Sequence, residues 1–241
     1  MVVDNGLVYY YDFASDLCLH STDSDVLARN LARLNEGDDA LDLDFINCSK
    51  STTISLDKSR YLYTDGTNDY LRSTLSNNPN INTRDNITVG AWCKLLNGSS
   101  WGIVSKYNQY ILGLNSLDRP AFLVYVQSTG WRPSGYNGNI WGDDSIDISE
   151  WHYWVGTYNK KDGSGGEIKF YCDGNLLSTN SIPAGPDNGR LVNDSGEFKL
   201  MKRDGSGNHQ RGGIAIAHCY NRVLSAEEIR QNYISTRGRF Q

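Results

Sequence analysis

With 241 residues, the chain can form one large β domain or two small ones, and 39% hydrophobic residues suffice for a full core. No apolar run reaches the length of a membrane-crossing helix, which argues against membrane insertion. The net charge of −5 includes no basic cluster interleaved with aromatic residues, so we do not expect nucleic-acid binding.

The first residues, 1–6, lack the basic and apolar stretches of a secretory signal. Five cysteines are spread along the chain without a Cys-x-x-Cys spacing: Cys18, Cys48, Cys93, Cys172 and Cys219. An odd number of distant cysteines favours buried thiols over disulfides or a zinc site. We expect the chain to fold in a reducing cytoplasm.

Charge is unevenly distributed. Residues 1–50 hold ten acidic and three basic side chains, whereas residues 199–241 hold eight basic and three acidic ones. The two ends could pair within a fold or between subunits, or they could be two ordinary solvated surfaces. The sequence leaves these alternatives open.

Segments rich in β-formers recur along the chain, with turn residues between them. Only the stretch from Val26 to Leu34, with apolar residues at helical spacing, predicts a short helix in the first half. Strands are expected at 7–13, 41–45, 61–63, 87–93, 102–106, 110–114, 121–126, 151–158, 167–172, 175–177, 198–201 and 213–220. Because no linker or repeat interrupts them, residues 1–241 are predicted to form a single domain.

The C-terminal element is a strand followed by a helix. Ser225-Ala226-Glu227-Glu228 has the pattern of a capping box, in which the serine hydroxyl and the glutamate carboxylate satisfy each other's backbone N–H groups. Leu224 and Ile229 flank it as a hydrophobic staple. Ile229 and Tyr233 share a face, so the helix can lie on a sheet. Gly238 is a candidate for the helix end.

Four stretches in this order resemble the laminin-G/concanavalin A-like lectin/glucanase jelly-roll family: 63–71, 87–94, 151–158 with 168–174, and 220–229. The resemblance implies an all-β, two-sheet antiparallel jelly-roll sandwich (concanavalin A-like) with a short C-terminal helix. It also implies edge loops that often bind glycans, and in some members calcium. The ending, residues 229–240, is similar to that of such domains in tailed-phage structural proteins, some of which sit on virion heads or tails.

Catalysis by a jelly-roll glycosidase requires two carboxylates about 5–10 Å apart. None of the six glutamates fits a Glu-x-Asp-x-x-Glu pattern. Asp42 and Asp44 are two apart in one strand, but they are expected on its wet face, opposite Leu41, Leu43 and Phe45. Four histidines on dissimilar segments are expected to be structural: His20, His152, His209 and His218. The sequence therefore argues against an enzyme.

Calcium is the one cofactor considered. Asp65 and Asp69 could supply oxygen ligands, although the turn at Asp65-Gly66 explains the first of them without a metal. Family members with a metal often use an acidic residue in the strand before the final helix, and Ala215 stands at the matching position.

The best glycan candidate is the aromatic loop 131–144, because sugars bind through aromatic faces together with amides and carboxylates. Its candidate residues are Trp131, Arg132, Tyr136, Asn137, Asn139, Trp141 and Asp143. Two other interpretations remain: the tryptophans pin the loop to the sheet, or the loop contacts a protein partner. Trp92, Trp151 and Trp154 lie in strands and are expected in the core.

The sequence thus predicts a non-catalytic binding or structural module, acting as a decoration, fibre or tail component of a virion assembled in host cytoplasm. Its expected partners are other virion structural proteins, a host cell-surface glycan, or both. The alternative is a carbohydrate-binding module or a glycoside hydrolase-like enzyme acting on polysaccharide.

Overall fold

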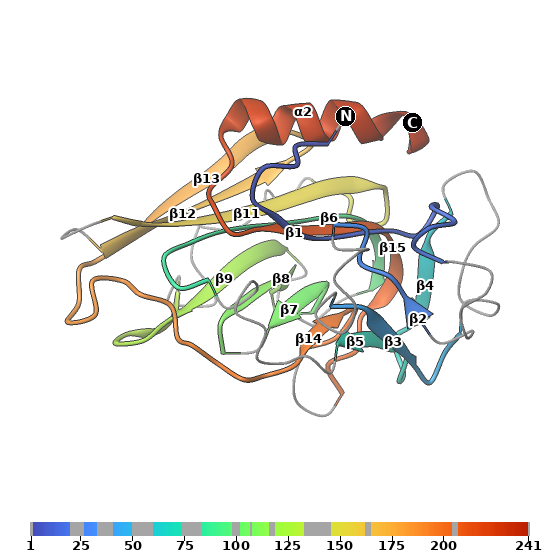
Figure 1. Cartoon of the computed structure of the whole chain (residues 1–241), viewed down its shortest axis with the longest axis horizontal. Coiled ribbons are helices and arrows are strands. Elements are labelled where there is room, and N and C mark those ends of the chain that lie inside the picture. The colour runs from blue at the N-terminus through green and yellow to red at the C-terminus, as the bar shows by residue number, and fades with distance from the viewer. Residues whose placement is uncertain are drawn as a thin grey trace.

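The structure, a computed structural model, describes residues 2–19, 27–32, 41–49, 60–73, 83–97, 102–106, 108–115, 119–132, 146–161, 165–203 and 207–240. Two antiparallel sheets face each other, and one helix lies on the outer face of one sheet (Figure 1). The predicted all-β jelly-roll sandwich with a short C-terminal helix is confirmed.

The first sheet carries the helix. Its strands are β1 (Leu7–Asp12), β4 (Leu62–Asp65), β6 (Asn86–Asn97), β11 (His152–Lys161), β12 (Gly165–Cys172), β13 (Asn175–Ile182) and β15 (Arg211–Tyr220). They are ordered β1-β15-β6-β11-β12-β13, and β4 pairs with β15 beyond the end of β1.

The second sheet is built from shorter strands. They are β2 (Leu27–Ala28), β3 (Leu43–Ile46), β5 (Tyr70–Ser73), β7 (Val104–Lys106), β8 (Tyr110–Leu114), β9 (Pro120–Val126), β10 (Gly130–Arg132) and β14 (Phe198–Leu200). Their order is β10-β9-β8-β7-β14-β5-β3-β2.

The core lies between the sheets, because alternate residues of each strand point inward. Leu41, Leu43 and Phe45 are all buried there, as their alternation predicts. The sheets approach closely at Gly156 of β11, where a Cβ would stand 2.0 Å from Cγ of Phe122 in β9. A glycine is needed at this contact for steric reasons.

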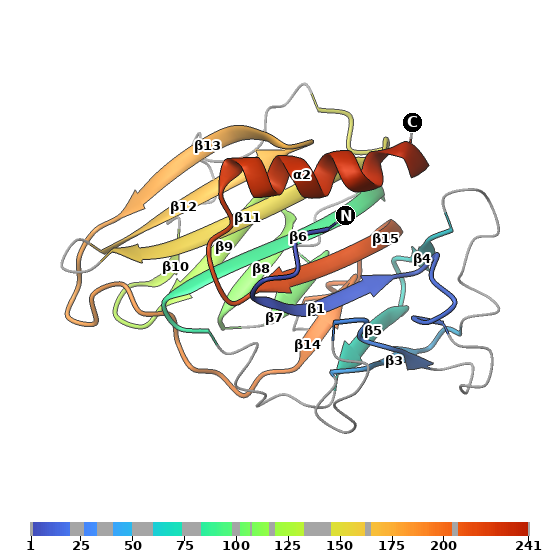
Figure 2. The same ribbon diagram turned by 45° about the horizontal axis from the view of Figure 1, so that its top comes forward.

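Helix α2 (Ala226–Thr236) lies over the outer face of the first sheet (Figure 2). A second apolar cluster forms beneath it. Ile229 is fully buried in it, and Tyr233 stacks on Trp92 of β6 with ring centroids 5.7 Å apart. Trp154 belongs instead to the core between the sheets, and Trp151 is partly buried against the outer cluster.

The helix begins as predicted. Ser225 Oγ accepts from the Glu228 N–H at 3.2 Å, and a Glu228 carboxylate oxygen accepts from the Ser225 N–H at 2.9 Å. The predicted helix end is wrong. Gly238 lies inside a 3₁₀ turn, η2 (Arg237–Arg239), which continues α2 without a left-handed residue.

The two ends of the chain meet on the first sheet, as Figure 1 shows. β1 pairs with β15, and the Arg239 guanidinium lies 2.8 Å from the Asp12 carboxylate. Val3 N–H also donates to the Asn232 side chain at 2.8 Å. Of the three interpretations of the charge asymmetry, pairing within the fold therefore applies to at least this contact.

The helix predicted from Val26 to Leu34 is wrong where the structure describes it. Leu27 and Ala28 form β2 and pair with Asp44 and Leu43 of β3. The strand is favoured over a short helix here, because pairing with β3 supplies backbone hydrogen bonds that a single helical turn would lack.

All five cysteines are free thiols, four of them buried. None of the helices within the described ranges combines the length and the hydropathy needed to cross a membrane.

Candidate functional site

A polar pocket of about 630 Å³ opens where β9 turns into β10. Its walls come from that turn, from the residues before β6, from the end of β11 and from the segment after β13. The residues that line it are Arg84, Gln127, Ser128, Lys160, Pro186, Asp187, Asn188 and Arg190.

Hydrogen bonds fasten the segment after β13 to the β9–β10 turn. Ser128 donates to the Asp187 carboxylate through its N–H, at 2.7 Å, and through its hydroxyl. Gln127 N–H donates to the Arg190 carbonyl at 2.9 Å. Gly189 adopts a left-handed φ of 77°, which glycine tolerates, and turns the segment back toward the pocket. The pocket is therefore shaped without a ligand.

Asp187 is the acidic group of the pocket. Burial acts to raise the pKa of its carboxyl, but hydrogen bonds from Ser128 outweigh burial and lower that pKa below its usual value. The carboxylate is thus ionised at neutral pH and is already engaged with the β9–β10 turn.

Arg84 is a cation of the pocket that donates to neutral acceptors. Its Nε donates to the Leu191 carbonyl at 3.3 Å and its Nη2 to Gln127 Oε1 at 2.6 Å, both neutral acceptors. Arg190, by contrast, lies 3.3 Å from the Asp85 carboxylate. Among the residues that the structure describes, Arg84 has no carboxylate partner, so its charge faces the pocket unneutralised.

The first two residues of the predicted aromatic loop 131–144 lie in a strand and not in a loop. Trp131 and Arg132 belong to β10, which pairs with the end of β9. Trp131 is partly buried against Ile111, Ala121 and Leu123, and its ring meets Tyr125 edge-on at 5.2 Å. This packing agrees with the pinning role for Trp131. The other candidates lie outside the described residues: Tyr136, Asn137, Asn139, Trp141 and Asp143.

Asp65 and Asp69 stand at the two ends of the turn between β4 and β5. Asp65 Oδ1 accepts from the Thr67 N–H at 2.7 Å, and Asp69 Oδ2 accepts weakly from the Asp65 N–H at 3.4 Å. Both carboxylates therefore accept hydrogen bonds from backbone N–H groups of the turn. Burial, together with the charge of Asp65, raises the pKa of Asp69. Ala215 is buried under α2.

The acids considered for catalysis lie where alternation predicts. Asp44 points away from the buried Leu43 and Phe45, and an Asp42 carboxylate oxygen accepts from the Asn30 N–H at 2.8 Å.

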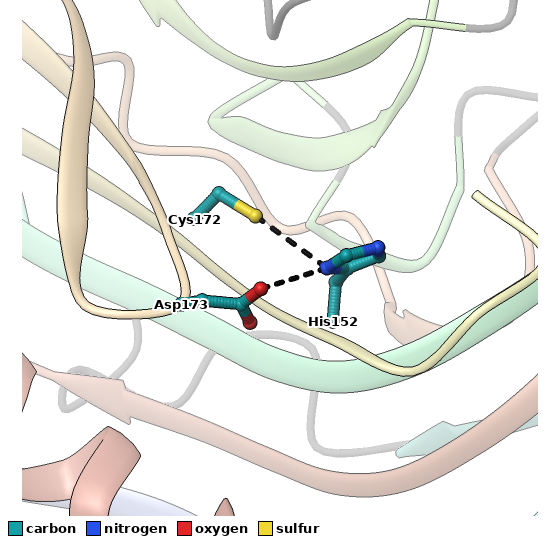
Figure 3. A group of neighbouring side chains, drawn as sticks. All are labelled: His152, Cys172 and Asp173. Carbon is teal, nitrogen blue, oxygen red and sulfur yellow. Dashed lines mark hydrogen bonds and ion pairs between the residues drawn. The ribbon is translucent and has the colours of Figure 1, made fainter. Parts of the chain in front are cut away.

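A cluster of possible metal ligands lies at one end of β11 and β12. His152, Cys172 and Asp173 each offer a ligand atom, and these atoms lie within 4.8 Å of one another (Figure 3). A hydrogen bond from the His152 ring to the Asp173 carboxylate raises the pKa of the imidazole.

The pocket has no signature in the sequence, because its residues come from four separate segments and form no motif. The available signal was Gly185-Pro186-Asp187-Asn188-Gly189, a run of turn residues between two strands. It indicates a shaped loop, but it does not say that Arg84 lies beside it.

Comparisons with known structures support the fold. The binding domain of Paraclostridial Mosquitocidal Protein 1 is 14% identical with a TM-score of 0.59, and the alignment covers 96% of this chain and 52% of that one. The receptor-binding domain of botulinum neurotoxin C/D mosaic serotype is also 14% identical, with a TM-score of 0.64 over 97% of this chain and 52% of that one.

A third similar structure is one of botulinum neurotoxin type C, whose cell entry is described as dependent on interaction with two ganglioside molecules. It is 12% identical, with a TM-score of 0.65 over 97% of this chain and 52% of that one. The chain thus spans about half the length of these solved structures, and at such low identity the likeness is one of fold.

A comparison with curated protein sequences gives no match. A family model described as the concanavalin A-like lectin/glucanases superfamily matches residues 65–230. The matched range runs from the end of β4 into α2 and contains most strands of both sheets. The chain therefore belongs to the concanavalin A-like lectin/glucanases superfamily.

Proposed function

We propose that the chain is a non-catalytic binding module and that its pocket at the β9–β10 turn recognises an acidic glycan, one that carries a carboxylate such as a sialic or uronic acid. Arg84 carries this proposal. A guanidinium held in place by neutral acceptors keeps its full charge and can offer two parallel N–H donors to a carboxylate.

The rest of the pocket suits a sugar. Lys160 adds a second positive charge, whereas Arg190 is paired with Asp85. Gln127 and Asn188 offer amides for hydroxyl groups. Asp187 is the only acidic residue among the described residues that line the pocket, and it accepts hydrogen bonds from Ser128. The lining is therefore net positive in a chain whose overall charge is −5.

Similar structures give the proposal a context. Besides the ganglioside-dependent toxin above, one binding domain of botulinum neurotoxin DC is described in complex with SialylT and another in complex with rat synaptotagmin II. These ligands belong to those proteins. They support the idea that this architecture serves recognition of glycans or proteins rather than catalysis.

The test is the affinity of the purified chain for sialylated and uronate-containing oligosaccharides, measured by calorimetry with and without calcium. We expect Arg84→Gln to weaken binding about tenfold or more, because a charge-assisted pair contributes about 1.5–3 kcal/mol. Arg230→Gln, the same charge change at an exposed position of α2, serves as the matched control and should bind like the unmodified chain.

Tight binding of neutral glycans, unaffected by Arg84→Gln, would refute the acidic-glycan assignment. Hydrolysis of a polysaccharide, abolished by Asp42→Asn or Asp44→Asn, would instead favour the glycoside hydrolase-like alternative.

The second candidate is a protein contact, favoured by Trp131 and Tyr125 side by side on the outer face of the second sheet.

We also retain the proposal that the module is a virion component beside other virion structural proteins, supported by the resemblance of residues 229–240 to phage domains. Mass spectrometry of purified particles tests it: the chain should be present in stoichiometric amount with its neighbours.

A further inference from the structure

We propose that His152, Cys172 and Asp173 form a binding site for a transition-metal ion, with Zn²⁺ as the preferred occupant. The site is separate from the glycan pocket and does not depend on the proposed function. It consists of one imidazole nitrogen, one cysteine sulfur, which would bind as a thiolate, and one carboxylate oxygen, a donor set that suits zinc better than calcium or magnesium.

The three donor atoms lie within 4.8 Å of one another. Cys172 Sγ lies 3.7 Å from His152 Nδ1, and Asp173 Oδ2 lies 2.8 Å from the same nitrogen (Figure 3). In a tetrahedral zinc site, bonds of about 2.3 Å to sulfur and about 2.0 Å to nitrogen place those two donors about 3.5 Å apart. The sulfur and the nitrogen thus have the required separation, and the carboxylate needs to move outward by about half an ångström.

His152 is oriented as a metal ligand usually is. Its other ring nitrogen, Nε2, lies 3.2 Å from the Asp147 carbonyl, which can accept its N–H. A metal-binding histidine typically donates its second ring N–H to such a partner, which leaves the first nitrogen free to bind the ion. A neutral imidazole has one N–H, yet both ring nitrogens of His152 face oxygen acceptors. Either a second proton on the ring or a metal ion between Nδ1 and the carboxylate resolves that mismatch.

The carboxylate is fixed as well. Asp173 Oδ1 accepts from the Tyr153 N–H at 2.9 Å, so Oδ2 remains directed at His152. The backbone of Asp173 is left-handed, with φ of 50°, at the tight turn with Gly174 between β12 and β13. The His152 and Asp173 side chains are 19% and 28% exposed, which gives an ion a path from solvent and leaves room for water as a fourth ligand.

The competing explanation is an imidazolium–carboxylate pair that merely stiffens the end of the sheet. That pair would use the histidine and the aspartate and would leave Cys172 a protonated thiol that only hydrogen-bonds to the ring. Metal binding differs because it requires the thiolate, and its formation releases the Cys172 proton to solvent. The two explanations can therefore be separated at Cys172.

The experiment uses the untagged chain, dialysed against a chelator and titrated with Co²⁺, followed by Zn²⁺ competition. We expect one ion per chain and a near-ultraviolet thiolate-to-cobalt absorption band, both displaced by Zn²⁺. Cys172→Ser should abolish the band and weaken Zn²⁺ binding at least about tenfold. Cys48→Ser, which changes a thiol outside the cluster, is the matched control and should keep both signals.

Asp173→Asn is the second variant, because asparagine tolerates the left-handed backbone and can still accept from the Tyr153 N–H. It should keep the thiolate band at saturating cobalt but bind Zn²⁺ at least about tenfold more weakly. If Cys172→Ser does not fold, the Zn²⁺ affinity of Asp173→Asn tests the proposal in its place. No band in the unmodified chain, or equal Zn²⁺ affinity in Asp173→Asn, would overturn the proposal.

Discussion

At the scale of single residues, His218 shows how burial controls the pKa of a side chain. It is 1% exposed in β15, and burial lowers the pKa of its imidazole from 6.5 to about 3. Its Nε2 lies 2.6 Å from the Tyr153 hydroxyl, so the neutral ring is held by one hydrogen bond. Gly90 in β6 makes room for it, because a Cβ there would stand 2.4 Å from the His218 ring.

This histidine should make the fold sensitive to acid. The unfolded chain takes up a proton on His218 below pH 6.5, whereas the folded chain does so only near pH 3. Stability is therefore fully present above pH 6.5 and falls as the pH drops, by up to about 1.4 kcal/mol per pH unit from this group.

Urea unfolding of the unmodified chain and of His218→Gln at pH 7, 6 and 5 checks this expectation. The variant should lose less stability on acidification. His152, whose pKa is raised and whose pH effect has the opposite sign, is present in both proteins and cancels in the difference. Parallel pH profiles for the two proteins would contradict the assignment.

Gly156 gives a packing prediction at the same scale. Because its missing Cβ leaves space for the Phe122 ring, Gly156→Ala should destabilise the fold by about 1–3 kcal/mol through overpacking. Gly238→Ala, where nothing lies within 4 Å of the added carbon, is the control and should change little. Adding Phe122→Leu to Gly156→Ala should recover part of the lost free energy of unfolding. If the double variant loses the simple sum of the two single-variant losses, the two residues are not in contact.

At the scale of elements, α2 is the most predictable part of the molecule. Its capping box, its staple and the shared face of Ile229 and Tyr233 depend on residues a few positions apart, and all three are present. Ser225→Ala should cost about 1 kcal/mol and lower the thermal midpoint by about 2–4 °C in calorimetry. An unchanged midpoint would mean that packing alone holds the helix.

The short strands were harder to predict. β2 and β10 have two and three residues, too few to show a period, and they exist because a neighbouring strand pairs with them. Pairing also explains how His152, Cys172 and Asp173 meet, since Trp154 of β11 lies opposite Cys172 of β12. The spacing of the cysteines along the sequence argued against a zinc site, because sequence spacing does not show which residues are brought together by pairing between strands.

At the scale of the whole molecule, the jelly-roll fold and the family were predictable because four stretches in sequence carry them, and the matched range 65–230 agrees. The pocket was not predictable, because Arg84, Gln127 and Asp187 meet only after the sheets have stacked and the segment after β13 has docked on the β9–β10 turn. A site made from loop residues of distant segments has no local signature.

The central claim, recognition of an acidic glycan at Arg84, is tested most directly on the ligand. The measurement is the affinity of the chain for one acidic oligosaccharide and for the same oligosaccharide after its carboxylate has been reduced to an alcohol. We predict that reduction weakens binding about tenfold or more, because the charge-assisted pair with Arg84 is lost. Equal affinity for the two forms, or no binding of either, would contradict the claim.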